Sequence, residues 1–222
     1  YSNFENDELF LKKIKALLEE KNASVGVGGY NEIRPIYTTD AYLVEGNQGP
    51  QWRTVHLGLD IWINAETPVF APLSGRMFGC TNNEGDRNYG PTIILEHQID
   101  SDLTFYTLYG HLSPKSLENF KIGQKIEAGQ QIATIGAAPN NGNWPAHLHF
   151  QIMLDMFNWK DDFPGVAFPH EKEIWLSLCP NPTDLFTSLK NILKEKETLS
   201  VAEILAKRNQ HLTKNLSVSY EN

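Results

Sequence analysis

The sequence lacks the features that mark several large classes of protein. It has only two cysteines, Cys80 and Cys179, which stand far apart and without a Cys-x-x-Cys spacing. That pattern indicates neither a zinc knuckle nor a disulfide framework, and we expect two buried thiols. No apolar run approaches the roughly 20 residues that a membrane helix needs. Clusters of lysine and arginine are also missing, and the formal net charge is -8, which argues against nucleic acid as a partner.

The length of the chain allows one main domain. It has 222 residues, of which 41% are hydrophobic, enough for a globular domain with a substantial core. It starts at Tyr1 without a methionine, as a cut end would, so residues upstream could carry targeting information. A basic segment followed by an apolar one, which is the pattern of a signal peptide, is not present at its start. We therefore expect a cytoplasmic protein without a membrane partner, and the oligomeric state stays open.

The pattern of apolar, β-prone and turn-forming residues divides the chain into three parts. Between Glu5 and Asn22, apolar residues recur at helical spacing, which predicts an amphipathic surface helix that ends before three glycines. Residues 1–30 would form this N-terminal helix and a linker. Over residues 31–186 we expect one all-β domain, because short β-branched and aromatic runs are divided by Gly, Pro and Asn. The expected strands lie in the runs IRPIY, DIWI, PVFAP, PTIILEH, LTFYTLY, KIEAG, QQIATIG and HLHFQI.

Helices are expected again near the C-terminus. An irregular stretch after Asp155, rich in proline and aromatic residues, first predicts a long ordered loop. A helix is then predicted over 182–197, and the Ser-x-x-Glu capping box at Ser200 predicts another that ends near Arg208. Residues 187–222 would thus hold C-terminal helices and a linker toward a following domain.

Two histidines stand one residue apart in the run HLHF. In a strand, His147 and His149 would project to one face with their Cα atoms roughly 6.5 Å apart, while Leu148 and Phe150 point into the core. One imidazole could then bind a metal while the other stands beside whatever the metal binds. Polar residues on an exposed strand face give the same pattern by chance, so the pair alone is weak evidence.

The segment RTVHLGLDIWI places His56 four residues before Asp60. In a fully extended strand their Cα atoms would be about 13 Å apart, too far to share an ion with ligand distances of about 2 Å. Gly58 permits a bend, so we expect His56 on a loop or bulge and Asp60 near the start of a strand. A helix would also bring them together, but Gly58 and the β-prone residues that follow argue against one. In the alternative interpretation, His56 caps a turn and Asp60 accepts backbone hydrogen bonds.

A third motif, LYGHLS, contains His111, which by itself could be a partly exposed histidine at the end of a strand. The three motifs together hold four of the seven histidines of the chain. This concentration in one β-domain indicates a shared site. We expect His97 and His170 to be structural, and His211 to lie in a solvated tail.

In this order, the motifs resemble those of the LytM/lysostaphin-type zinc metallopeptidases, which have the duplicated hybrid motif fold. The resemblance rests on R-x-x-H-x-G-x-D-I at 53–61, YGHLS at 109–113 and HLHF at 147–150, and it covers roughly residues 50–185. It implies a mainly β fold, a small antiparallel β-sandwich with flanking N- and C-terminal helices. The site would lie in a groove across one sheet.

The resemblance also implies the roles of five residues. Zinc would be held by His56, Asp60 and His149, with a fourth position open for water. His111 and His147 would be the unliganded catalytic pair, and which of the two is the general base stays open. The implied activity is endopeptidase-type hydrolysis of a peptide bond, in a peptidoglycan-like substrate or in a Gly/Ala-rich peptide.

A second interpretation keeps the fold without the chemistry. The groove would then capture a ligand or dock a domain, as in a non-catalytic, regulatory LytM-like module. Members of that kind generally lack metal ligands, and this chain lacks none. A cytoplasmic location nevertheless supports this alternative, because it removes wall peptidoglycan as an obvious substrate.

The chain departs from the family pattern around the His-x-His motif. The family usually has Ser/Thr-Gly-Pro before that motif and Glu after it, whereas this chain has Trp144-Pro145-Ala146 and then Gln151. Neither change removes a ligand, but both alter the floor of the groove. Trp144 is either a substrate-stacking platform or a packing residue. The long segment 153–180 could cover one end of the groove.

The run RNQHLTKNLSVSY at 208–220 resembles the opening segment of class III, pyridoxal-phosphate-dependent aminotransferase domains. The resemblance implies an internal domain of a multidomain cytoplasmic protein, whose neighbouring domains are its partners. The given chain has no cofactor lysine and no aminotransferase core, so it should not bind pyridoxal phosphate.

Overall fold

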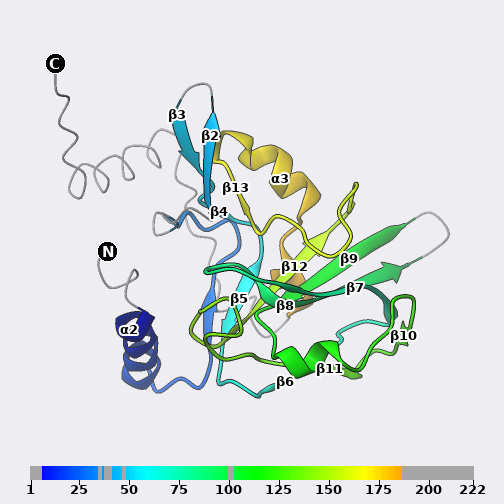
Figure 1. Cartoon of the computed structure of the whole chain (residues 1–222), viewed down its shortest axis with the longest axis horizontal. Helices are drawn as coiled ribbons and strands as arrows, with labels where there is room; N and C mark the ends of the chain where they lie inside the picture. Colours follow the sequence, from blue (N-terminus) through cyan, green and yellow to red (C-terminus); the bar gives the residue numbers. More distant parts are fainter. Residues whose placement is uncertain (1–6, 35–36, 38–41, 47–48, 100–102, 187–222) are drawn as a thin grey trace.

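The computed structural model describes residues 7–34, 37, 42–46, 49–99 and 103–186 of the chain. Over these residues the protein is mainly β, with two α-helices, α2 (Asp7–Glu20) and α3 (Lys172–Leu178). The largest unit is a seven-stranded sheet with the strand order β1-β5-β12-β9-β8-β7-β10 (Figure 1). All of its neighbouring strands are antiparallel. The expected mainly β, antiparallel fold is confirmed.

The strands of the large sheet are short at its edges and longer in its middle. They are β1 (Gly26–Gly28), β5 (Leu59–Trp62), β12 (His147–Met153), β9 (Thr104–Gly110), β8 (Gly90–Gln98), β7 (Gly75–Asn83) and β10 (Lys125–Ile126). Three strand pairs accompany the sheet. They are β2 (Leu43–Gly46) with β3 (Gly49–Trp52), β4 (Val55–His56) with β13 (Val166–Ala167), and β6 (Pro68–Phe70) with β11 (Gln131–Thr134).

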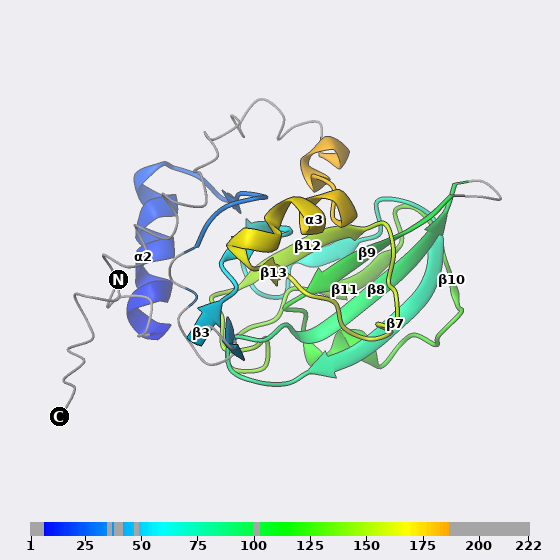
Figure 2. The ribbon, with the colours of Figure 1, turned by 90° about the horizontal axis from the view of Figure 1, so that it is seen from above.

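Apolar side chains pack against both faces of the large sheet. On one face, Leu148 and Phe150 of β12 belong to a core cluster with residues of β6 and β11, which form the second layer of a small sandwich. On the other face, Met153 packs with Phe163 and with side chains of α3. Figure 2 shows α3 over this part of the sheet, near β12 and β13, while α2 stands at the end of the molecule away from β10. Because side chains alternate along a strand, the histidines of β12 point away from the sandwich core.

The register of β12 brings the sequence motifs together. This strand lies between β5 and β9. His149 lies opposite Asp60 on β5 and opposite Gly110 on β9, the residue before His111. Segments that are far apart in the sequence therefore meet on three adjacent strands.

The N-terminal half contains strands that the sequence pattern does not predict. The helix expected from Glu5 to Asn22 is present as α2, but the glycines after it form β1, which pairs with β5. Strand β7 was absent from the expected strands because its run GRMFGCTNN is rich in glycine and polar residues. Its long pairing with β8 stabilises it instead. The hairpin of β2 and β3 was also not expected, and it too is stabilised by pairing between its strands. The run KIEAG forms a strand only at Lys125–Ile126.

The C-terminal part departs from the expected loop and helices. The stretch after Asp155 contains β13, the 3-10 turn η3 (Pro169–Glu171) and α3, so it is less irregular than its sequence indicates. A 3-10 turn, η4 (Pro182–Leu185), stands where a longer helix is expected to begin. The rest of that helix, the helix capped at Ser200 and the aminotransferase-like run lie outside the described residues.

The remaining expectations concern cysteines and isolated histidines. Cys179 is fully buried as expected, but Cys80 is only partly buried. His97 is buried and bonded to the Ser74 carbonyl, as a structural residue would be. The side chain of His170 is 57% exposed, so it has no place in the core, and His211 lies outside the described residues. No helix in the described part of the chain is long and apolar enough to cross a membrane.

Candidate metal centre

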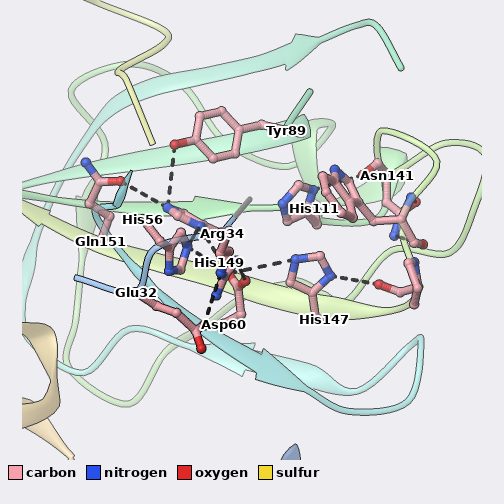
Figure 3. A network of polar contacts seen from close by, with 12 residues as sticks. Glu32, Arg34, His56, Asp60, Tyr89, His111, Asn141, His147, His149 and Gln151 are labelled. Carbon is pink, nitrogen blue, oxygen red and sulfur yellow. Dashed lines mark hydrogen bonds and ion pairs between the residues drawn. The ribbon is translucent and has the colours of Figure 1, made fainter. Parts of the chain in front are cut away.

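Three predicted ligands converge on the face of the sheet opposite the sandwich core. His56 Nε2 lies 3.1 Å from His149 Nδ1 and 3.3 Å from Asp60 Oδ1, and the last two atoms are 3.2 Å apart (Figure 3). Each of these residues is at most 3% exposed. Within the described residues, they form a group whose geometry could hold a metal ion. The structure thus brings together the side chains that the sequence assigned to one site.

The backbone around Gly58 explains the convergence. His56 lies in the short strand β4 rather than on the loop or bulge that we expected, and Asp60 is the second residue of β5. A Cβ atom on Gly58 would lie 2.5 Å from the His149 ring and 2.8 Å from the Phe150 carbonyl oxygen. Gly58 is therefore needed because the imidazole of His149 occupies the space beside it, in addition to any bend between the two strands.

Hydrogen bonds to oxygen atoms orient the ligand rings. His56 Nδ1 lies 3.0 Å from the Gly29 carbonyl, and His149 Nε2 lies 3.0 Å from Gln151 Oε1. These oxygens only accept, so each neutral ring donates there and keeps a lone pair on its other nitrogen. The two lone pairs and the Asp60 carboxylate then face one another without a hydrogen between them. A cation at their centre would relieve this repulsion, so the donor set fits a metal ion.

Arg34 holds the far side of the Asp60 carboxylate. Its Nη1 donates to Asp60 Oδ2 and to the Tyr37 hydroxyl (2.7 Å), and its Nε donates to Glu32 (3.2 Å). Burial opposes ionisation of Asp60, but His56 and Arg34 outweigh it and hold the pKa of the carboxyl well below its usual range. Asp60 is therefore ionised at neutral pH, with Oδ1 turned toward the histidines.

The two histidines assigned to catalysis lie beside the ligand group. The ring centroids of His111 and His147 are 4.3 Å apart, and His147 Nε2 lies 3.8 Å from Asp60 Oδ1. Burial lowers the pKa of His147 to about 4, although the Asp60 carboxylate opposes this shift. Burial, followed by the neighbouring His147 and His149 rings, lowers the pKa of His111 well below its usual range. Both rings are thus neutral at pH 7.

Backbone carbonyls also fix the orientation of this pair. His111 Nδ1 lies 2.9 Å from the Asn141 carbonyl and His147 Nδ1 lies 2.7 Å from the Pro145 carbonyl. Each ring donates there, which leaves its Nε2 able to accept a proton. His111 has φ 61°, a left-handed conformation that is uncommon for a residue with a side chain. Its backbone is held by bonds to Tyr89 and Gly136.

These residues lie in a groove of about 620 Å³. Trp62 stacks on His147, with the ring centroids 4.2 Å apart. Trp144 is 8% exposed and contacts both the Phe10 ring, in a T-shaped pair, and the Arg87 guanidinium, which favours its interpretation as a packing residue. Another part of the groove wall comes from the segment 153–180, which was expected to cover one end of the groove. Its lining side chains include Trp159, Asp162 and Phe163.

Several residues in contact with the site were given no specific contact from the sequence, and Gln151 was expected only to alter the floor of the groove. Gln151 could have been found, because it follows His149 at strand spacing and therefore shares its face. Arg34, Tyr89 and Asn141 come from segments without a motif, and only the folded chain places them at the site.

Comparisons with known proteins agree with the sequence motifs. Residues 54–160 match Peptidase family M23. Lysostaphin of Staphylococcus staphylolyticus is 33% identical over 106 residues, which are 47% of this chain and 20% of that protein. The glycyl-glycine endopeptidase ALE-1 of Staphylococcus capitis is 32% identical over 105 residues, 46% of this chain and 26% of that protein. An uncharacterized lipoprotein, YgeR, of Escherichia coli K12 is 34% identical over 95 residues, 43% of this chain and 33% of that protein.

The matched part of the chain thus spans a third or less of each of these relatives. Among solved structures, the solution structure of lysostaphin is 24% identical with a TM-score of 0.47, and the match covers 79% of this chain and 55% of that one. The crystallized catalytic domain of lysostaphin from Staphylococcus simulans is 29% identical with a TM-score of 0.38, covering 68% of this chain and 91% of that one. Together, the family match and the relatives support a peptidase domain of the M23, LytM/lysostaphin type within this chain.

Proposed function

We propose that this chain, with its M23 peptidase domain over residues 54–160, is a zinc-dependent metallohydrolase that cleaves a peptide bond in the manner of an endopeptidase. The observation that carries the proposal is the group formed by His56, Asp60 and His149. It turns two nitrogen lone pairs and one carboxylate oxygen toward a common centre, with 3.1 to 3.3 Å between them. A metallohydrolase needs such a centre beside groups that can move a proton, and His111 and His147 would supply those groups.

Zinc suits this donor set. It binds imidazole nitrogen and carboxylate oxygen, and a catalytic site keeps three protein ligands and one open position. His56 Nε2, His149 Nδ1 and Asp60 Oδ1 would hold it. Bound there, zinc would supply a Lewis acid that polarises a peptide carbonyl and acidifies the attacking water.

Residues of the chain would then accept the proton from water and pass it on. His111 and His147 are neutral, and each has Nε2 free to accept a proton from water because its Nδ1 donates to a backbone carbonyl. A ring that has taken up the proton becomes a donor, which can protonate the leaving amine or stabilise the negative charge on the carbonyl oxygen. Their adjacent positions leave the division of these roles open.

A peptidoglycan-like or Gly/Ala-rich peptide is the proposed substrate. The support comes from relatives named lysostaphin and glycyl-glycine endopeptidase, at 33% and 32% identity. Because the match spans at most a quarter or so of those proteins, the substrate has to be tested directly. We also propose that the chain is one domain of a longer cytoplasmic protein that continues into a class III aminotransferase domain, for which the run at 208–220 is the support.

The proposed activity is tested with the whole chain loaded with one equivalent of zinc. It is incubated with oligoglycine, oligoalanine and muropeptides, and the products are identified by mass spectrometry. We expect cleavage of at least one class, loss of cleavage after chelation and recovery when zinc is restored. Zinc that binds without any cleavage across the panel would favour the alternative function, a LytM-like docking module.

A further inference from the structure

Gln151 lies between a candidate ligand and the long segment that follows β12. It is completely buried. Its Oε1 lies 3.0 Å from His149 Nε2, and its Nε2 donates to the Pro164 carbonyl at 3.1 Å and to Cys179 Sγ at 3.4 Å. The carbonyl can only accept, so it fixes the amide with the nitrogen toward Pro164 and the oxygen toward His149.

We infer that Gln151 is a positioning residue that keeps the Nδ1 lone pair of His149 available for a metal ion. The single proton of a neutral His149 ring can lie on Nε2, toward Gln151, or on Nδ1, toward His56 Nε2 (3.1 Å) and Asp60 Oδ1 (3.2 Å). A proton on Nδ1 would block metal binding. It would also leave His149 Nε2 and Gln151 Oε1 as two acceptors facing each other at 3.0 Å, which the fixed amide makes unfavourable.

Tyr89 does not replace Gln151 in this role. Its hydroxyl lies 3.5 Å from His149 Nε2, longer than the 3.0 Å to Gln151. The Tyr89 ring is held against two glycines, because a Cβ on Gly165 would lie 2.0 Å from its hydroxyl and one on Gly110 would lie 2.6 Å from its ring. It limits the space around His149, while Gln151 accepts the proton.

One short segment, residues 163–167, makes contacts that orient both candidate histidine ligands. Its Pro164 carbonyl orients Gln151, and its Val166 pairs with His56 through β13 and β4. The Gly165 carbonyl also accepts from the Leu57 backbone. These residues lie just beyond the part of the chain that matches the peptidase family. Besides lining the groove, they orient the candidate ligands.

The test is the zinc affinity of the full chain, measured by competition with a chromophoric chelator. Gln151→Met keeps the length of the side chain but loses the strong acceptor, and we expect it to bind zinc 10–100-fold more weakly, as is typical for loss of a group that orients a ligand. Gln151→Glu keeps an accepting oxygen but cannot donate to Pro164. It should therefore lose thermal stability while its zinc affinity stays within about threefold of wild type. Gln151→Leu repeats the apolar test with another shape.

A matched control separates orientation from general destabilisation. Thr107→Val removes a buried hydroxyl that is bonded to His97, outside the site, and should lower stability without changing zinc affinity. In the zinc-loaded protein, proton NMR should show the His149 Nε2–H as a hydrogen-bonded, slowly exchanging signal that is lost in Gln151→Met. Unchanged affinity and an unchanged signal in that variant would overturn the inference. The inference rests on the proposed metal site, but wild type that binds zinc and cleaves no peptide would refute only the proposed activity.

Discussion

His149 Nδ1 lies 3.2 Å from Asp60 Oδ1, although 89 positions separate the two residues in the sequence. The pairing of β5 with β12 places them opposite each other. A nitrogen lone pair and an ionised carboxylate at this distance repel each other unless a proton or a cation lies between them. A cation between these atoms would remove the repulsion, which is the physical basis of the proposed metal site.

The assignment of ligand and catalytic roles predicts different behaviour for the two histidines of β12. His149→Ala removes one of three metal donors and should abolish zinc binding. His147→Ala should keep zinc and lose hydrolysis, because it removes a group that accepts a proton. Elemental analysis of dialysed protein and peptide turnover measure the two effects. The control, His170→Ala, changes an exposed residue and should alter neither, and equal zinc occupancy in wild type and His149→Ala would reject the ligand assignment.

The space around Gly58 predicts a second outcome. Gly58→Ala places a Cβ atom against the His149 ring and the Phe150 carbonyl, so we expect a loss of roughly 1–3 kcal/mol of unfolding free energy together with weaker zinc binding. Urea unfolding and zinc titration measure these changes. Gly29→Ala is a matched control near the site, because its Cβ would meet only Glu32 at 3.9 Å. Wild-type zinc affinity in Gly58→Ala would show that the His149 ring does not need that space.

Much of the site could be predicted from the sequence because its motifs lie on strands. Strand spacing puts His147 and His149 on one face, and the separation of His56 from Asp60 requires a break at Gly58. The ligand set and the catalytic pair came from the family resemblance, and the structure places all five side chains together. Their roles stay predictions until metal and turnover are measured.

Other parts depend on tertiary packing and leave no local signal. Arg34 precedes a proline in a segment without a recognisable motif, yet folding brings it to Asp60. Strand prediction uses hydrophobic alternation as its signal, and β7 has few apolar residues. Its backbone pairing with β8, which stabilises the strand, leaves no mark in the local sequence. The stretch after Asp155 looked irregular because β13 is only two residues long.

Arg34 provides a third prediction. Its side chain is 11% exposed and that of Asp60 is 3% exposed, so their ion pair is buried. Arg34→Met leaves an uncompensated carboxylate, which should destabilise the metal-free protein by about 3–5 kcal/mol. Zinc should recover part of this loss, because it neutralises the same carboxylate. The measurement is urea unfolding with chelator and with zinc.

The control for this variant is Arg76→Met, an exposed residue of β7. It should change stability little and should show the same gain from zinc as wild type. An Arg34→Met protein whose stability matches wild type in the presence of chelator would contradict the importance of the buried pair. A gain from zinc no larger than that of wild type would show that the ion and Arg34 do not act on the same group.

Buried neutral histidines predict how stability depends on pH. Burial lowers the pKa of His97, opposed in part by the Ser74 carbonyl, and burial lowers the pKa of His147 to about 4. Unfolded histidine has a pKa of about 6.5, so above that pH both states are neutral and this stability is fully present. As pH falls below about 6.5, the unfolded chain takes up protons that the folded chain does not. The free energy of unfolding should then fall by up to about 1.4 kcal/mol per pH unit for each such histidine.

The metal-free protein, kept in chelator, is unfolded with urea between pH 8 and pH 5 to measure this slope. His97→Gln removes one of the groups whose pKa is lowered, so its stability should fall less steeply below pH 6.5 than that of wild type. Gln98→Ala changes the exposed, uncharged neighbour and should keep the wild-type slope. A free energy of unfolding that stays constant over this range would mean that the rings take up protons in the folded state as readily as in the unfolded chain, so that burial does not lower their pKa.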